Sequence, residues 1–339
     1  MIHDPVSVPF ATDASLNACG VVVIGRNEGE RLKRCLDSVR AAGARVVYVD
    51  SGSTDGSDEW ARVAGIDLVA LDMSVPFTAA RARNAGFARL CETAPALRFV
   101  QFVDGDCEIT PDWLRVAVSF LEGLPEAACV CGRLRERFPD RSIYNRLCDI
   151  EWNRPVGETD SCGGIVMMRS DRFAAVGGFR ESLIAGEEPD LCLRLRARGG
   201  RIWRVAEDMA WHDAAMTRFG QWWRRAMRGG HALAEGMAMH GKDSSASDKR
   251  RLRRVLGWGM ALPSVVLVLA PLHPAWLALL AVYPLRFVRL AWKASGIRPS
   301  AKWLWAGFMV LSSFPEAAGV SAYWLNRSRA RRAKLIEYK

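Results

Sequence analysis

The sequence predicts an α/β fold, with a mainly parallel sheet that carries helices on both faces, followed by membrane-associated helices. Three observations support this prediction. Strand and helix patterns alternate from residue 19 to about residue 206, acidic side chains follow two of the strands, and residues 255–285 contain no Asp, Glu, Lys or Arg. Alternation of this kind is typical of parallel sheets, in which ligands bind beyond the carboxyl ends of the strands.

The individual elements follow from the spacing of apolar residues. Short β-branched or apolar runs predict buried strands, and these runs lie at residues 21–24, 46–49, 66–71 and 99–103. A helix is predicted where apolar residues are spaced i, i+3, i+4 and i+7, as in Leu32, Cys35, Leu36 and Val39. Further helices are expected at residues 60–64, 78–91 and 110–121. The second and fourth strands end at Asp50 and Asp104.

Composition divides the 339 residues into five segments. We expect a flexible lead-in (1–18), the α/β domain (19–216), an amphipathic interface helix with a linker (217–254), membrane helices (255–325) and a basic cytoplasmic tail (326–339). The first residues have no basic stretch before an apolar run, so they predict neither a signal nor a transit peptide. Nine scattered cysteines without a C-x-x-C pair fit a reduced compartment.

A pair of carboxylates flanks one glycine in Asp104-Gly105-Asp106, directly after the fourth strand. Mg²⁺ and Mn²⁺ are hard cations that prefer oxygen ligands and bind beside substrate phosphates, and glycine lets the backbone approach a ligand closely. An acidic turn of this composition is also a common surface feature. The position of the pair after a buried strand favours a divalent-metal site.

Two further polar motifs carry candidate chemistry. The loop from Asp50 to Ser57 follows the second strand, and Asp50 could bond the base or ribose of a nucleotide, although the same loop could simply cap the next helix. Glu187 and Glu188 follow Gly177-Gly178-Phe179 at an expected helix start. Acidic residues stabilise a first helical turn for structural reasons. The functional interpretation is a general base, for which burial would have to raise the pKa of a glutamate.

The order of these motifs resembles that of one known family. A strand with Asn27-Glu28 is followed by Asp-x-Gly-Ser-Thr-Asp-Gly from Asp50, by Asp-x-Asp, by Gly-Gly-Phe, and by an acidic pair before Leu-Cys-Leu-Arg-Leu. Over roughly residues 20–230 the sequence resembles the family 2 glycosyltransferases of the GT-A fold. The resemblance implies an inverting, Mg²⁺- or Mn²⁺-assisted transfer of a sugar from a nucleotide-diphosphate sugar to a hydroxyl acceptor. That acceptor would be lipid-linked or a polysaccharide precursor.

The resemblance also implies a role for each matching residue. Glu188 falls at the position of the catalytic base, where aspartate is usual, and Glu187 is its neighbouring rival. The metal would be held by Asp104, Asp106 and His212, although a single histidine is as often structural. The donor nucleotide sugar would be bound by Asn27, Glu28, Asp50, Ser51, Arg83 and Asp104. The acceptor or a phosphate would be contacted by Asp190, Gln221, Arg224 and Arg225.

Besides Glu188, two further departures from the family pattern limit these implications. The segment Gln221-Trp222-Trp223-Arg224-Arg225 resembles the Q-x-x-R-W motif of polysaccharide synthases, but Arg225 stands in place of the tryptophan. This argues against processive synthesis. Arg26 stands in place of the usual tyrosine before Asn27-Glu28, so the donor contacts there are expected to differ.

The second half of the chain predicts membrane association. Residues 217–239 form a basic, aromatic helix of the type that lies on a lipid surface, and residues 255–292 suit a hairpin that turns near 271–274. Residues 303–325 contain Pro315-Glu316, which favours a kinked, re-entrant or interfacial segment over a third span. The basic flanks of these segments place the catalytic domain on the cytoplasmic side of the inner membrane. Membrane lipid is therefore an expected partner.

Other functions fit parts of the sequence. A sugar nucleotidyltransferase shares a similar fold, but no Gly-rich, Arg- or Lys-bearing phosphate loop follows the first strand. A non-catalytic membrane scaffold that binds nucleotide sugar would not need Asp104, Asp106 and Glu188 together. Nucleic-acid binding would account for the net charge of +10, but the arginines crowd the membrane segments, where anionic lipid accounts for them better. We expect no nucleic-acid partner.

Overall fold

The computed structural model describes residues 13–329 as two compact units. The N-terminal unit comprises residues up to 138, 151–183 and 187–214, and the C-terminal unit comprises residues 139–150, 184–186 and those from 215 onward. Most of the expected lead-in and of the expected basic tail lies outside the described residues. Within the lead-in, a short helix α1 (Asp13–Asn17) is present, and Ser15 Oγ donates to Glu122 Oε2 at 3.2 Å.

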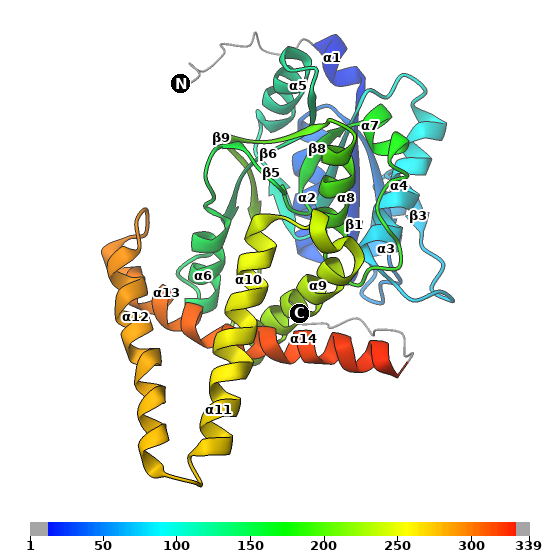
Figure 1. Ribbon diagram of the computed structural model, residues 1–339. Helices are drawn as coiled ribbons and strands as arrows, with labels where there is room; N and C mark the ends of the chain where they lie inside the picture. The colour runs from blue at the N-terminus through cyan, green and yellow to red at the C-terminus, as the bar shows by residue number, and fades with distance from the viewer. Residues whose placement is uncertain (1–12, 330–339) are drawn as a thin grey trace. The chain divides into compact units, whose positions relative to one another are not determined.

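The N-terminal unit is built on one mixed sheet (Figure 1). Its strand order is β3 (Asp67–Ala70), β2 (Arg45–Asp50), β1 (Cys19–Gly25), β4 (Phe99–Asp104), β8 (Val166–Arg169), β6 (Ala127–Glu136), β9 (Arg201–His212) and β5 (Cys107–Ile109), with β7 (Gly157–Glu158) beside β9. The four strands that the sequence predicts are parallel to one another. The later strands mix directions, because β8 runs antiparallel to both β4 and β6.

Helices connect these strands along the chain. They are α2 (Glu30–Ala41), α3 (Ser57–Val63), α4 (Ala79–Thr93), α5 (Trp113–Gly123), α6 (Ile143–Trp152), α7 (Ser170–Ala175) and α8 (Glu187–Ala197). Helices α2 to α5 and the start of α8 lie where the sequence predicts a helix, whereas α6 and α7 are not predicted by it. The four residues that define the apolar face of α2 are all fully buried. Helix α4 lies especially close to the sheet, because a Cβ at Gly86 would be only 2.3 Å from Val22 Cγ1.

The register of the central strands brings polar residues to one edge of the sheet. Ile24 at the end of β1 lies opposite Asp104 on β4, and Gly25 lies opposite Asp50 on β2. The inward residues of β1, β2 and β4 are almost completely buried, so each strand can expose its polar groups only where it ends. The carboxyl ends of three neighbouring strands therefore form a single polar edge.

The C-terminal unit is helical. Its elements after residue 215 are α9 (Phe219–His240), η1 (Gly241–Asp243), α10 (Ala246–Leu256), η2 (Gly257–Ala261), α11 (Leu262–Leu269), η3 (Pro274–Ala281), α12 (Val282–Lys293), α13 (Pro299–Leu311) and α14 (Ser313–Ser328). Two stretches, Ala246–Leu269 and Pro274–Lys293, are long and apolar enough to cross a membrane. They form a hairpin whose turn lies at residues 270–273 (Figure 1).

Glycines allow the helices of this unit to touch backbone to backbone. A Cβ at Gly319 of α14 would lie 1.9 Å from the carbonyl oxygen of Met227 on α9, and a Cβ at Gly230 would lie 2.0 Å from that of Glu316. A Cβ at Gly259 of η2 would meet the carbonyl oxygen of Ser313 at 2.1 Å. Small residues at such crossings are typical of helices that associate in membranes.

The segment that contains Pro315 and Glu316 is divided into two helices. Helix α13 ends at Leu311 and α14 begins at Ser313, before the proline. Glu316 is buried, and its Oε2 accepts hydrogen bonds from Arg254 at 2.7 Å and from Arg251 at 3.4 Å. The sequence shows the acidic residue in this apolar segment but not its partners, because they lie more than 60 residues earlier on α10.

Candidate active site

The loop after β2 is organised around the carboxylate of Asp50. Its Oδ1 accepts a hydrogen bond from the Tyr48 hydroxyl at 2.8 Å, and its Oδ2 accepts from the backbone N–H groups of Gly52 and Ser53, both at 2.9 Å. Burial and the neighbouring carboxylate raise the pKa of Tyr48, so its hydroxyl remains a donor. Tyr48 precedes Asp50 by two residues and therefore shares its face of the strand. The sequence could have revealed this contact.

The loop after β1 is joined to the loop after β2. The N–H of Asn27 donates to Ser53 Oγ at 3.0 Å, and Asn27 Oδ1 accepts from the N–H of Thr54 at 2.7 Å. Asn27 has a φ of 57°, a left-handed conformation that asparagine tolerates better than most residues. These bonds fix the position of the neighbouring Glu28, which pairs with Arg31 at 2.7 Å.

Ser51 supplies an unpaired polar group at the same edge. Its N–H donates to the carbonyl of Gly25 at 3.1 Å. Its hydroxyl is buried without a hydrogen-bond partner among the described residues. Because an unpaired buried hydroxyl is costly, this atom is suited to contact a polar ligand beyond the strand ends.

The carboxylate pair after β4 is held by side chains from two directions. Asp106 is buried, and its Oδ2 lies 2.9 Å from Nε2 of His212. Asp104 is more exposed, and its Oδ1 accepts a hydrogen bond from Arg83 at 2.8 Å. Asp106 and His212 are brought together because β5 and β9 pair with Cys107 opposite His212.

These residues fit a divalent cation by the chemistry of their donor atoms. A carboxylate oxygen of Asp106, a ring nitrogen of His212 and the Sγ atom of Cys107 all lie within 4.8 Å of one another. Carboxylate oxygens suit both Mg²⁺ and Mn²⁺, and Mn²⁺, the softer of the two cations, is also compatible with imidazole. His212 is also stacked on Trp152, with 4.7 Å between ring centroids. This contact fixes the plane of the imidazole, and no local pattern in the sequence predicts it.

Arg83 links the carboxylate pair to the acidic helix start. Its guanidinium donates to Asp104 Oδ1 at 2.8 Å and to Glu187 Oε1 at 2.7 Å, while its Nε has no partner among the described residues. Burial disfavours the charged form, but Asp104 and Glu187 outweigh it and raise the pKa of Arg83. A Cβ at Gly164 would lie 2.5 Å from Nη2, so the glycine makes room for this bridge. Arg83 is thus part of the polar edge.

The two adjacent glutamates have different surroundings. Glu187 pairs with Arg83, as described above. Glu188 is 6% exposed, and its Oε1 accepts a 2.6 Å hydrogen bond from the backbone N–H of Cys162. Burial raises the pKa of Glu188 well above its usual value. Of the two, Glu188 therefore has the environment that makes a carboxylate more basic.

The remaining candidates are engaged in structural contacts. Asp190 is buried and pairs with Arg194 at 2.7 Å and with Arg180 at 3.4 Å. In the C-terminal unit, Gln221 Oε1 accepts from the N–H groups of Thr217 and Arg218, both at 2.9 Å, at the start of α9. Arg224 and Arg225 lie in the first turns of the same helix. Their proposed contacts with an acceptor or a phosphate remain predictions.

Comparison with known proteins identifies the class of this fold. Residues 20–175 match the family model of glycosyl transferase family 2. A mannosyltransferase from Pyrobaculum calidifontis, solved with GDP-Man and Mn²⁺, has 20% sequence identity and a TM-score of 0.53, covering 97% of this chain and 90% of its own. S. aureus TarS (residues 1–349) has 12% identity and a TM-score of 0.50, covering 92% of each chain. The fold is thus that of the GT-A transferases.

Sequence relatives point to the same family. The pre-mycofactocin glycosyltransferase of Mycobacterium tuberculosis is 29% identical over 226 residues, which is 62% of this chain and 46% of the relative. Glycosyltransferase AglE of Haloferax volcanii is 27% identical over 186 residues, which is 51% of this chain and 59% of the relative. The match thus spans about half the length of these relatives. These matches support the resemblance of the sequence to the family 2 glycosyltransferases.

Proposed function

We propose that the chain transfers a glycosyl group from a nucleotide-diphosphate sugar to an acceptor hydroxyl, with inversion at the anomeric carbon. The observation that carries this proposal is the polar edge at the ends of β1, β2 and β4. There Asp50, the unpaired Ser51 hydroxyl and the Asp104–Arg83–Glu187 chain of charges lie on neighbouring strands and helices. Asp50 would orient the nucleoside, and the unpaired Nε of Arg83 could donate to a phosphate oxygen.

Asp104, Asp106 and His212 would hold Mg²⁺ or Mn²⁺ at this edge. A bound cation would offset the charge that develops on the leaving nucleoside diphosphate. The protein's own contribution is to fix the ligands in advance, through the Asp106–His212 contact, the stacking of His212 on Trp152 and the Asp104–Arg83 hydrogen bond. Fixed charges and dipoles of this kind need little reorganisation during the reaction.

Glu188 is the proposed general base. It would take the proton from the acceptor hydroxyl as the oxygen attacks the anomeric carbon, and the bond to the diphosphate oxygen would break at the same time. A base that works near neutral pH needs a raised pKa, and burial gives Glu188 that property. Glu187 is the rival candidate. Its pairing with Arg83 at 2.7 Å favours its charged form and makes it the weaker base.

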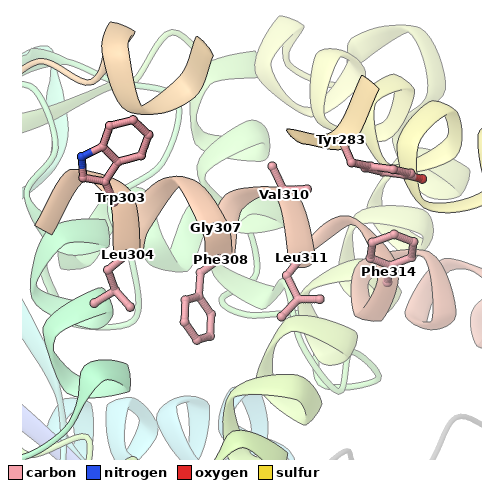
Figure 2. A pocket seen from close by; sticks show the side chains of 8 residues that line it. All are labelled: Tyr283, Trp303, Leu304, Gly307, Phe308, Val310, Leu311 and Phe314. Carbon is pink, nitrogen blue, oxygen red and sulfur yellow. The ribbon is translucent and has the colours of Figure 1, made fainter. Parts of the chain in front are cut away.

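A lipid-linked acceptor, such as a precursor in polysaccharide synthesis, is the proposed partner of the C-terminal unit. Besides the two candidate spans, this unit contains a pocket of about 500 Å³ (Figure 2). Aromatic and apolar residues of α12, α13 and α14 line it, namely Tyr283, Trp303, Leu304, Gly307, Phe308, Val310, Leu311 and Phe314. Such a lining suits an acyl or isoprenoid chain better than a polar saccharide.

The proposed location is the cytoplasmic membrane, with the α/β domain in the cytoplasm. The basic flanks of the hairpin support this orientation through the positive-inside rule. Cys91 is the exposed cysteine among the described residues, so Ile336→Cys in a Cys91→Ser background provides a label near the C-terminus. In intact cells this cysteine should resist a membrane-impermeant thiol reagent. Rapid labelling would mean that residues 303–325 cross the membrane.

Turnover by the purified full chain in lipid nanodiscs tests the function. The chain would be incubated with UDP- and GDP-sugars, Mn²⁺ or Mg²⁺, and a set of polyprenyl-phosphate and glycosylated-lipid acceptors. We expect a glycosylated product of inverted anomeric configuration and release of nucleoside diphosphate. Release of free nucleoside diphosphate without any glycosylated product, across all acceptors, would argue against the acceptor class. Retention of configuration would overturn the mechanism.

A further inference from the structure

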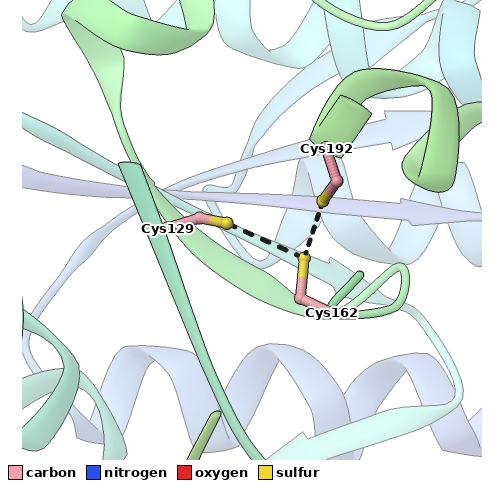
Figure 3. A group of neighbouring side chains, drawn as sticks. All are labelled: Cys129, Cys162 and Cys192. Atoms are coloured by element: carbon pink, nitrogen blue, oxygen red, sulfur yellow. Dashed lines mark hydrogen bonds between the residues drawn. The ribbon is translucent and has the colours of Figure 1, made fainter. Parts of the chain in front are cut away.

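Three cysteines that are distant in sequence meet beside Glu188. Cys129 lies on β6, Cys162 lies in the loop before β8, and Cys192 lies on α8 (Figure 3). Cys162 Sγ lies 3.9 Å from Cys129 Sγ and 3.5 Å from Cys192 Sγ, and all three side chains are buried. The proposed reaction does not by itself require thiols at this place.

Two of these cysteines donate to the same carboxylate oxygen. Glu188 Oε1 lies 2.9 Å from Cys192 Sγ and 3.2 Å from Cys162 Sγ, in addition to the 2.6 Å hydrogen bond from the N–H of Cys162. Cys192 follows Glu188 by four residues, so the helix places both on one face. Three donors from two segments thus converge on one oxygen and leave the side chain of Glu188 little rotational freedom.

We propose that Cys162 and Cys192 are positioning residues, whose thiols aim the carboxylate of Glu188 and set its basicity. This inference rests on the proposed function of Glu188 as the base. A thiol is a weak donor, so it orients a carboxylate while stabilising the charged form less than a hydroxyl group would. A serine in either position would bind the carboxylate more strongly and make it a poorer base.

Other groups around the carboxylate are compatible with this role. Burial raises the pKa of Cys162 and of Cys131 on β6, so both remain protonated near neutral pH. Contacts with Cys129 and Cys162 lower the pKa of Cys192, so its donor role rests on the 2.9 Å distance between its Sγ and Glu188 Oε1. Arg204 on β9 approaches the cluster, but its guanidinium donates to the carbonyl groups of Gly132 at 3.0 Å and of Cys162 at 3.4 Å. It therefore holds the loop of Cys162 in place.

The test is the pH dependence of kcat/KM for Cys192→Ser and Cys192→Ala in the full chain. The base must be deprotonated, so activity rises with pH through its pKa. This rise is the acidic limb of the pH profile. Serine strengthens one hydrogen bond to the carboxylate and should move the limb to lower pH, whereas alanine removes that bond and should move it to higher pH. Each shift should be about 0.5–1 pH unit. The KM for the donor should stay within about twofold, because the thiol does not contact the nucleotide.

Two controls distinguish positioning from packing. Cys129→Ala removes a thiol of the same cluster that, within the described part of the chain, bonds Cys162 and not Glu188, and its acidic limb should remain where it is in the wild type. Cys162→Ser should shift the limb in the same direction as Cys192→Ser. Shifts of equal sign for serine and alanine at position 192, or no shift in either, would overturn the proposal, because packing defects do not depend on donor strength.

Two further measurements distinguish the positioning role from a zinc site and from an error in the proposed base. Three cysteines and a carboxylate are also ligands that zinc accepts, so the metal content of the purified chain is measured. One equivalent of zinc that is lost in Cys192→Ser would overturn the positioning role. If Glu188→Gln keeps wild-type turnover, the proposed base itself is wrong. If Glu188→Gln is inactive while the cysteine variants leave the limb unmoved, the positioning role alone fails.

Discussion

The two units of the molecule position acidic side chains in different ways. In the N-terminal unit, Asp104, Asp106 and Glu188 gather at the ends of strands and at a helix start, where each is aimed by a specific partner. In the C-terminal unit, Glu316 lies inside a helix, and both of its partners are arginines of α10. In the proposed function the first arrangement presents carboxylates to a ligand, whereas the second neutralises a charge within helix packing.

This difference shows that an acidic residue in an apolar segment is not by itself a functional site. Buried carboxylates need partners wherever they occur, and only the kind of partner distinguishes the two cases. Substitutions in the N-terminal group should therefore change catalysis at nearly constant stability. Substitutions in the C-terminal group should change stability while the chemistry of the surviving protein stays the same.

Glu188→Gln should give the largest effect. The amide keeps the shape of the side chain but cannot accept the proton, so kcat should fall by about 10²–10⁴-fold while the thermal unfolding midpoint changes little. Glu187→Gln is the matched control, which weakens the hold on Arg83 and should raise the donor KM more than it lowers kcat. Both are measured by steady-state kinetics. If Glu188→Gln kept wild-type activity and Glu187→Gln were inactive, Glu187 would be the base and not Glu188.

Gly319→Ala should destabilise the C-terminal unit by about 1–3 kcal/mol, as overpacking does. The new methyl group would lie 1.9 Å from the carbonyl oxygen of Met227, so α9 and α14 would have to separate. Gly236→Ala is the control on α9, where a Cβ meets nothing within 4 Å, and it should stabilise the helix by about 0.5–1 kcal/mol. Thermal unfolding in nanodiscs compares the two. Equal midpoints would mean that the helices do not meet at Gly319.

Glu316→Gln should have a smaller effect on stability, about 1–2 kcal/mol. Its removal leaves Arg254 and Arg251 without their carboxylate, but Arg251 is 41% exposed, so water limits the cost. The same unfolding assay measures the change, and the donor KM should remain at its wild-type value. A large loss of turnover without loss of stability would instead mean that Glu316 takes part in the reaction, against the comparison drawn above.

Local patterns predicted the first half of the sheet because each strand there is a continuous apolar run that ends in a polar loop. The run at residues 99–103 and its terminal Asp104 are visible in the sequence without any knowledge of the fold. The later strands were not predicted, because β8 and β9 pair with strands distant in sequence, and their short or mixed patterns do not stand out.

The site residues could be predicted from the sequence only where local patterns mark them. Asp50, Asp104 and Asp106 follow strands and were found on that basis. The contacts of Arg83 with Glu187, of His212 with Asp106 and of Cys162 with Glu188 join residues 104, 106 and 26 positions apart. No spacing rule connects such residues, because only the pairing of the strands and the packing of α4 and α8 bring them together.

The most direct measurement of the central claim is the binding of UDP and GDP to the wild type and to Asp106→Asn, by calorimetry with and without Mn²⁺. Asparagine keeps the shape of the side chain but removes one negative charge from the proposed cation ligands. We expect Mn²⁺ to strengthen nucleotide binding to the wild type by at least about tenfold, which corresponds to ~1.4 kcal/mol, and to have little effect on the variant at an unchanged unfolding midpoint. Equal enhancement by Mn²⁺ in both proteins would contradict a cation held by Asp106.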